Sequence, residues 1–239
     1  MSHFSDIGFG KFEDKSYYQA HYFNFMNEIL DGNYGVPEIK KAGENNSLHI
    51  YSLGGISYVY LIDDEKDEII DFEIGYKNEI IAVGRGLCRA FTTNGTAFCN
   101  VQIEVDGIPF CFACLNAPIF DIEDDDNDDE IEFSVASFAE SSEILSRDEL
   151  SINKYKKMGI ESYIAYFKDD PSNGFVSGII KDFALEQNPV TKENYYVVDA
   201  DCLGVHFKML IDPKMVSDEL EVGKVICGSF WNTAMIIAK

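Results

Sequence analysis

Hydrophobic residues near the start of the chain recur at helical spacing. They form one apolar face between about Glu13 and Leu30, made of Tyr18, Tyr22, Phe25, Met26, Ile29 and Leu30. The next segment, Asp31-Gly32-Asn33, carries the glycine and asparagine that commonly end a helix. The pattern predicts an amphipathic helix, whose aromatic stripe is more often part of a core than a docking face.

Beyond residue 45 the apolar positions alternate instead, which indicates β-strands. Leu48 to Leu53 and Ile56 to Ile62 flank Gly54-Gly55, a typical two-residue hairpin turn. Ile69 to Ile74 alternates with acidic residues and adds a third strand. Residues 1–78 are therefore predicted to form a helix packed on a small antiparallel sheet.

Longer strands are predicted in the rest of the chain, and we divide it into a β module at 79–145 and a C-terminal β module at 146–239. The first module contains Ile80 to Phe91, Ala97 to Val105, Ile108 to Leu115 and a strand through Ile131, Phe133 and Val135. The second contains Ser162 to Phe167, Gly174 to Leu185, Tyr195 to Cys202, Val205 to Ile211 and Lys224 to Ile237. A short helix is predicted within Pro213 to Leu220, and the polar residues 146–158 are interpreted as a helix or linker.

The two modules resemble each other. Gly86-Leu87-Cys88-Arg89-Ala90-Phe91 aligns with Gly178-Ile179-Ile180-Lys181-Asp182-Phe183, Phe98 and Val101 with Tyr195 and Val198, and Gly107-Ile108-Pro109-Phe110 with Gly204-Val205-His206-Phe207. Both segments have the pattern of a long strand, a turn and a hairpin, which is how small barrels of the OB type begin. Chance similarity between two β-meanders is the competing explanation. The predicted fold class is α+β and mostly antiparallel β. It consists of the N-terminal helix and sheet, followed by two related β-meander modules, for which OB-like barrels are the candidate architecture.

Charge changes the picture of possible partners. The chain has 42 acidic and 19 basic residues, a net charge of −23, and eight of the ten residues 121–130 are acidic. Such a run repels itself and predicts a solvated loop. The candidate partner-binding residues are therefore Asp124, Asp125, Asp126, Asp128, Asp129 and Glu130, with Asp63, Asp64, Glu65, Asp67 and Glu68 as an alternative acidic surface. This charge favours a basic protein partner and disfavours nucleic acid and anionic membranes.

The sequence indicates no catalytic, cofactor-binding or metal-binding residues. Cys111-Phe112-Ala113-Cys114 is a lone C-x-x-C in a predicted strand, without the second pair or histidines that zinc sites use. The six cysteines, Cys88, Cys99, Cys111, Cys114, Cys202 and Cys227, lie in apolar segments, which favours buried free thiols over disulfides. His206, beside the second hairpin turn, could face a groove but is interpreted as a satisfied or solvent-facing histidine. Trp231, the only tryptophan, is interpreted as a buried anchor of the last strand.

The chain begins Met1-Ser2-His3-Phe4-Ser5-Asp6-Ile7-Gly8-Phe9 and has Gly223-Lys224-Val225-Ile226-Cys227-Gly228-Ser229-Phe230-Trp231 near its end. These two segments resemble an uncharacterised family of bacterial cytoplasmic proteins, whose members have a similar M-S-H-F-S-x-I-G-F opening and G-x-F-W strand. The segments 134–140, 188–191 and 202–204 are similar as well. Asn232-Thr233-Ala234 departs from the small-Gly-basic ending expected of the family. The resemblance implies no activity, so no functional residue is carried over from it.

Together these features predict a non-catalytic acidic protein-binding protein. Its concrete form is an immunity or inhibitor protein that neutralises a basic toxin, such as a nuclease. Two alternatives stay open: an enzyme that uses carboxylates in a cleft between the modules, and a structural module whose charge serves solubility. A cytoplasmic location is expected, because the start of the chain lacks a basic and apolar leader and no apolar stretch approaches about eighteen residues.

Overall fold

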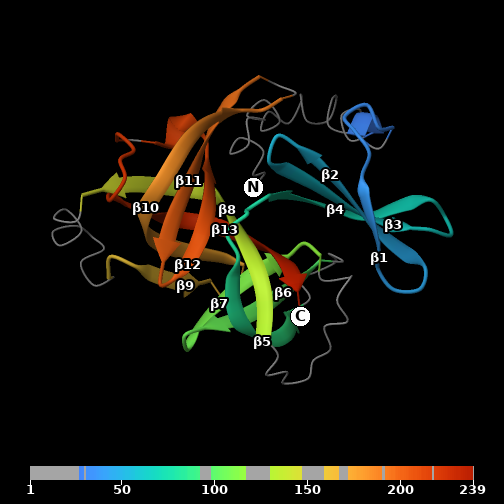
Figure 1. The fold of residues 1–239 in the computed structure, drawn as a ribbon, viewed down its shortest axis with the longest axis horizontal. Helices are drawn as coiled ribbons and strands as arrows, with labels where there is room; N and C mark the ends of the chain where they lie inside the picture. Colours follow the sequence, from blue (N-terminus) through green and yellow to red (C-terminus); the bar gives the residue numbers. More distant parts are fainter. Residues whose placement is uncertain are drawn as a thin grey trace.

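A computed structural model describes residues 27–29, 31–91, 98–116, 130–146, 159–166, 172–189, 192–216 and 218–238. The described chain is mostly β, in antiparallel sheets, which confirms the coarser part of the predicted fold class (Figure 1). The predicted helix at 13–30 lies outside the described residues except for 27–29, which are helical and include the fully buried Ile29. Within the described ranges, no helix has the length and apolarity needed to cross a membrane.

Four strands form the first sheet, in the order in which they occur in the sequence. They are β1 (Glu38–Lys41), β2 (Asn46–Leu53), β3 (Ile56–Asp63) and β4 (Glu68–Tyr76), all antiparallel. The predicted turn at Gly54-Gly55 is confirmed, since the two residues have φ of 63° and 138°, which glycine adopts readily. The sequence analysis missed β1, a four-residue edge strand whose Glu-Ile-Lys-Lys sequence shows no apolar alternation.

Nine strands make up the second sheet. They are β5 (Ala82–Phe91), β6 (Cys99–Val105), β7 (Ile108–Cys114), β8 (Glu130–Leu145), β9 (Ser162–Ala165), β10 (Asn173–Gln187), β11 (Asn194–Cys202), β12 (Val205–Ile211) and β13 (Val225–Ala238). The short helix predicted within Pro213 to Leu220 is a single 3-10 turn, η4 (Pro213–Met215). Every strand predicted in this region is present, and β8 is much longer than its predicted core around Phe133.

The pairings of this sheet close two rings of five strands. In the first, β5, β6 and β7 form an antiparallel meander, β7 runs parallel to β13, and β8 pairs with both β13 and β5. In the second, β10, β11 and β12 form the meander, β12 runs parallel to β8, and β13 pairs with both β8 and β10. The long ribbon of β8 and β13 therefore belongs to both rings.

The two meanders also match residue by residue. The turns Asp106-Gly107 and Leu203-Gly204 share left-handed backbone angles, with φ of 51° and 81° in one and 56° and 84° in the other. Phe110 and Phe207, which the sequence alignment pairs, occupy the same position after each turn. Both are fully buried, and their ring centroids are 6.1 Å apart.

Apolar side chains gather in two places. One cluster fills the interior of the rings and includes Phe110, Phe112, Phe133, Phe207 and Phe230. The other lies between the four-stranded sheet and the outer side of the rings and includes Tyr58, Tyr60, Leu210, Phe138 and Trp231. Trp231 is 7% exposed and packs on Phe138 with 5.3 Å between ring centroids, which confirms that the tryptophan is buried. The second cluster fixes the four-stranded sheet against the rings.

Candidate functional site

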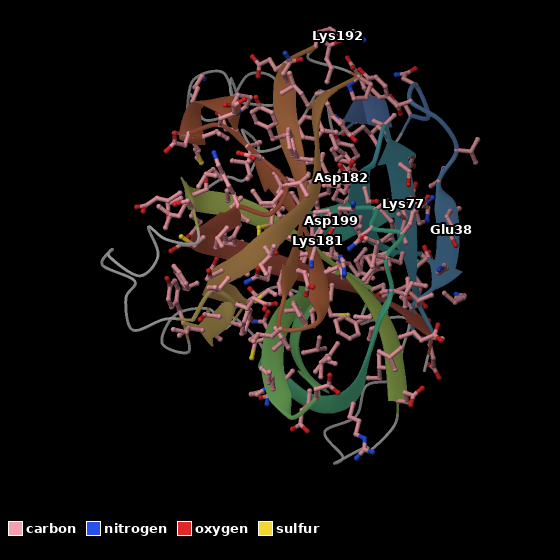
Figure 2. The ribbon with its side chains drawn as sticks, turned by 60° about the vertical axis from the view of Figure 1, so that its left-hand side comes forward. Glu38, Lys77, Lys181, Asp182, Lys192 and Asp199 are labelled. Carbon is pink, nitrogen blue, oxygen red and sulfur yellow. The ribbon has the colours of Figure 1, made fainter. Side chains whose placement is uncertain are left out.

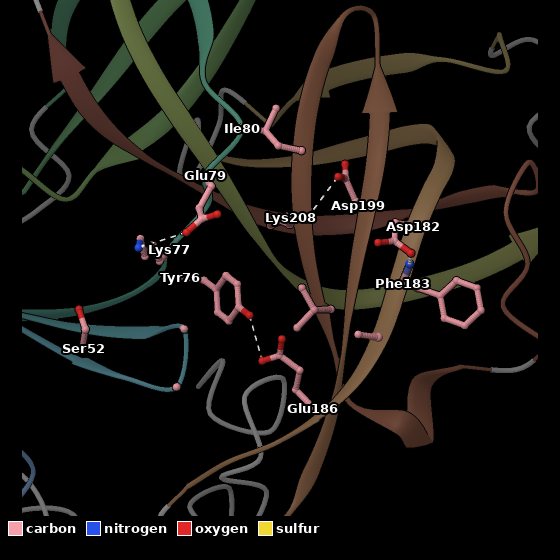
Figure 3. Close-up of a pocket in the computed structure, with 14 residues that line it drawn as sticks. Ser52, Tyr76, Lys77, Glu79, Ile80, Asp182, Phe183, Glu186, Asp199 and Lys208 are labelled. Carbon is pink, nitrogen blue, oxygen red and sulfur yellow. Dashed lines mark hydrogen bonds and ion pairs between the residues drawn. The ribbon is translucent and has the colours of Figure 1, made fainter.

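A cavity of about 630 Å³ lies where the four-stranded sheet meets the outer face of β10, β11 and β12 (Figure 3). Its walls come from the β2–β3 turn, the end of β4, the segment that follows β4, and the three strands of the second meander. The lining residues are Ser52, Gly54, Gly55, Tyr76, Lys77, Glu79, Ile80, Asp182, Phe183, Ala184, Glu186, Val197, Asp199 and Lys208. In the view of Figure 2, Asp182, Asp199 and Lys77 lie near the centre, whereas Glu38 and Lys192 lie near the edge.

A β-bulge on β10 places an acidic residue on the cavity face. The register runs from Ile180 opposite Ala200 to Asp182 opposite Asp199, so Lys181 is the extra residue. Asp199 in turn lies opposite Lys208 on β12. The result is a row of charged residues across three strands, with two carboxylates directly opposite each other. Like charges in such a pair are destabilising.

Within this row, Asp199 is neutralised and Asp182 is not. Asp199 is 6% exposed, and its carboxylate contacts Lys208 Nζ at 3.2 Å and His206 Nδ1 at 2.9 Å. His206 is thus a satisfied histidine, as expected. The exposed Asp182 accepts a hydrogen bond only from the backbone N–H of Phe183, at 2.9 Å, and no described cation pairs with it.

Two tyrosines hold a second carboxylate at the other end of the cavity. Glu186 Oε2 accepts hydrogen bonds from the hydroxyls of Tyr76, at 3.0 Å, and Tyr195, at 2.9 Å. Burial, and then the carboxylate itself, raise the pKa of both hydroxyls, which therefore stay protonated donors. Among the described residues, Glu186 Oε1 has no hydrogen-bond partner. The Tyr76 ring also packs closely on the β2–β3 turn, since a Cβ at Gly55 would lie 2.6 Å from it.

The remaining lysine of the cavity is paired internally. Lys77 Nζ lies 3.3 Å from Glu79 Oε1, and both side chains are largely exposed. Between them, the buried Asn78 donates to the carbonyls of Val135, at 2.9 Å, and His206, at 3.3 Å, which fixes this segment on the parallel pair of β8 and β12. The cavity thus has four carboxylates and two lysines, and each lysine pairs with one carboxylate. Asp182 and Glu186 carry the excess negative charge.

Of the sequence-predicted partner-binding residues the structure describes only Glu130, which does not line this cavity. Asp124, Asp125, Asp126, Asp128 and Asp129 lie outside the described residues, and Glu130 is the exposed first residue of β8, opposite Arg85. In the alternative surface, Asp63 pairs with Lys66, and Asp64 accepts from Ser47 and pairs with Lys41. The cavity residues were missed because their polar positions are spread over separate strands.

The described cysteines are buried free thiols: Cys111, Cys114, Cys202 and Cys227. The side chains of Cys88 and Cys99 lie outside the described part of the structure. Burial raises the pKa of Cys111 to about 11, which leaves little thiolate at neutral pH. In the described ranges, no three His, Cys, Asp or Glu side chains are grouped so that they could hold a metal ion.

No family model, curated protein or solved structure matches this chain. The resemblance of its two ends to bacterial cytoplasmic proteins therefore stays a prediction. Function has to be inferred from the chemistry of the cavity and its surroundings.

Proposed function

We propose that this protein is a non-catalytic binding protein for a cationic partner, with the cavity at the centre of its binding face. The observation that carries the proposal is the excess of carboxylates there: no cation among the described residues pairs with Asp182 or Glu186, while both lysines are already paired. A cationic group that reaches them gains charge-assisted hydrogen bonds. The form of the function that fits best is an immunity or inhibitor protein that covers the basic surface of a toxin.

The finer fold supports this placement. We infer that the two five-stranded rings are OB-like barrels, since each is a three-strand meander closed by two further strands. Barrels of this type bind ligands on the outer face of their second and third strands. In the second ring these strands are β11 and β12, and they supply Val197, Asp199 and Lys208 to the cavity.

Overall charge supports a protein partner rather than nucleic acid. At −23 the chain attracts cationic surfaces over roughly the 8 Å screening length of physiological salt. Phosphate contacts require a cationic surface, so nucleic acid is not expected to bind. Steering of this kind speeds association and weakens as salt rises.

Affinity capture from the native cytoplasm tests the proposal. The immobilised protein should retain a basic protein at low salt, and the association rate of that partner should fall steeply with ionic strength. Asp182→Asn combined with Glu186→Gln should weaken its binding about ten-fold or more, because two charge-assisted contacts are lost.

Two controls separate this result from simple ion exchange. Asp218→Asn with Glu219→Gln removes the same two charges from exposed positions outside the cavity lining, and should leave binding nearly unchanged. An acidic polypeptide of equal charge and scrambled sequence should not retain the partner. Equal losses in both double variants, or tight binding of an oligonucleotide, would contradict the proposal.

One observation favours the enzyme alternative. The four carboxylates line a concave cavity between the N-terminal sheet and the C-terminal strands, and a cleft between modules is where that alternative places its acids. Mass spectrometry of a ligand incubated with the protein distinguishes the two. A binding protein returns the ligand unchanged, whereas an enzyme converts it and loses this activity in Glu186→Gln.

A further inference from the structure

We propose that the cavity is a two-point site for a linear dication, in which two ammonium groups are joined by a hydrocarbon chain, as in a diamine. The inference rests on the proposed function, because both require that Asp182 and Glu186 remain available to a ligand. To the proposed function it adds the length of the ligand, the positions of its charged and apolar parts, and its chemical class.

The spacing of the two carboxylates sets the length of the ligand. Asp182 and Glu186 both lie on β10 after the bulge, four residues apart, so they share one face of the strand. A strand rises about 3.3 Å per residue, which separates the two positions by about 13 Å. The two ends of the cavity are therefore anionic and well apart.

Between these ends the floor is apolar. Ala184 lies midway on β10, on the same face, and its cross-strand partner is Val197 on β11. Val197 is 6% exposed, and both residues line the cavity. The Phe183 ring does not contribute, because alternation puts it on the opposite face and Figure 3 shows it directed away from Glu186. A methylene chain matches this floor, whereas a third charge at its centre would lose hydration without gaining a partner.

Each end has a reason to accept an ammonium group. At one end, Asp182 faces Asp199 across the bulge, and the side chains of Lys208 and His206 pair with Asp199 rather than Asp182. A cation beside Asp182 relieves the repulsion between the two carboxylates. At the other end, the hydroxyls of Tyr76 and Tyr195 orient Glu186 through Oε2 and leave Oε1 for the ligand.

1,5-Diaminopentane has the matching dimensions. Its two nitrogens are six bonds apart, or about 7.5 Å when extended, and an N–H···O contact of about 2.8 Å at each end brings the reach to about 13 Å. 1,3-Diaminopropane spans only about 5 Å between nitrogens, or about 10.5 Å with both contacts, and falls short. Two lysine side chains of a protein could present the same pair of charges. The cavity volume of about 630 Å³, in the usual range for small-molecule sites, favours the free diamine.

Isothermal titration calorimetry of the whole chain at physiological salt tests the proposal with 1,5-diaminopentane, 1,3-diaminopropane and the peptide acetyl-Lys-Gly-Gly-Gly-Lys-amide. 1,5-Diaminopentane is expected to bind at one site per chain, about ten-fold or more tightly than 1,3-diaminopropane, because only the longer diamine makes both charge-assisted contacts. Asp182→Asn and Glu186→Gln should each weaken 1,5-diaminopentane about ten-fold and reduce its advantage over 1,3-diaminopropane. Asp218→Asn with Glu219→Gln should change the affinity less than about two-fold.

The outcomes distinguish this proposal from the function on which it rests. Equal affinities for 1,5-diaminopentane and 1,3-diaminopropane, or equal losses in the cavity and control variants, overturn the two-point site. Binding of the peptide without binding of 1,5-diaminopentane overturns the diamine assignment and leaves the protein partner standing. Glu186→Gln keeps an oxygen that accepts from both tyrosines, and the melting temperature of each ligand-free variant shows whether it has folded.

Discussion

Trp231→Ala tests whether the four-stranded sheet and the rings share one core. Trp231 lies on β13, between Phe138 of β8 and Asn173 of β10. It belongs to the apolar cluster that also contains Tyr58 and Tyr60 of the four-stranded sheet. Its truncation removes packing from both sides at once.

The magnitude follows from burial. A tryptophan buries at most about 250 Å², and this one keeps only 7% of its surface exposed. At about 25 cal/mol per Å² the burial is worth close to 6 kcal/mol as an upper bound, of which alanine retains a part. Truncations of large aromatic residues in cores cost about 3–5 kcal/mol. We therefore expect a loss of about 4 kcal/mol in the free energy of unfolding.

The assay is urea unfolding followed by far-ultraviolet circular dichroism, because the variant lacks the only tryptophan. Ile237→Ala on the same strand is the matched control, since Ile237 is 49% exposed and should cost less than about 1 kcal/mol. In the unaltered protein, the indole should emit at short wavelength and resist quenching by iodide. A loss below about 1.5 kcal/mol for Trp231→Ala would refute the shared core.

Three further measurements follow from the structure. Tyr163→Phe removes a buried hydroxyl that donates to the Cys111 carbonyl at 2.6 Å and accepts from the Cys111 N–H at 3.0 Å. The urea midpoint should therefore fall by an amount equivalent to about 1–3 kcal/mol. An unchanged midpoint would mean that solvent replaces both hydrogen bonds. Burial raises the pKa of Cys111 to about 11 and of Cys202 to about 12, from 9.0 when unfolded. The folded state thus keeps protons that the unfolded state releases, and stability should be intact below pH 9 and fall progressively between about pH 9 and 12; a flat urea midpoint over this range would count against the burial of these thiols. Replacing residues 124–129, which include five aspartates, with a Gly-Ser linker should leave the melting temperature unchanged or raise it, because like-charge repulsion is removed; a fall of several degrees would show that an ion or a partner segment stabilises this run.

The hairpins could be predicted from the sequence because their signals are local. Alternation around Gly54-Gly55 and Asp106-Gly107 specifies both the turn and the register of the strands beside it. The edge strand β1 lacked such a signal. So did the polar second half of β8, where Ser141, Ser142 and Glu143 lie opposite β13 and carry no apolar alternation.

The strands that close the rings could not be identified from the sequence, because closure depends on pairs far apart in the chain. β8 and β13 pair although about eighty residues, from Leu145 to Val225, separate them in the sequence. No sequence pattern in either strand indicates that the two pair with each other. The candidate site could not be predicted from the sequence for the same reason. Tyr76 reaches Glu186 across 110 positions, and only the folded chain shows that they share a cavity.

A comparison of the two meanders shows which residues distinguish the one that lines the candidate site. At positions that correspond in the alignment, Phe98 and Tyr195 are both aromatic, and Phe110 and Phe207 are identical, so the shared residues maintain the cores. The cavity residues break the match instead. Asp182, Asp199 and Lys208 correspond to Ala90, Gln102 and Cys111, which carry no charge at neutral pH. This charged row, which a bulge places on a face that the four-stranded sheet leaves partly open, is the feature on which the proposed binding of a cationic ligand depends.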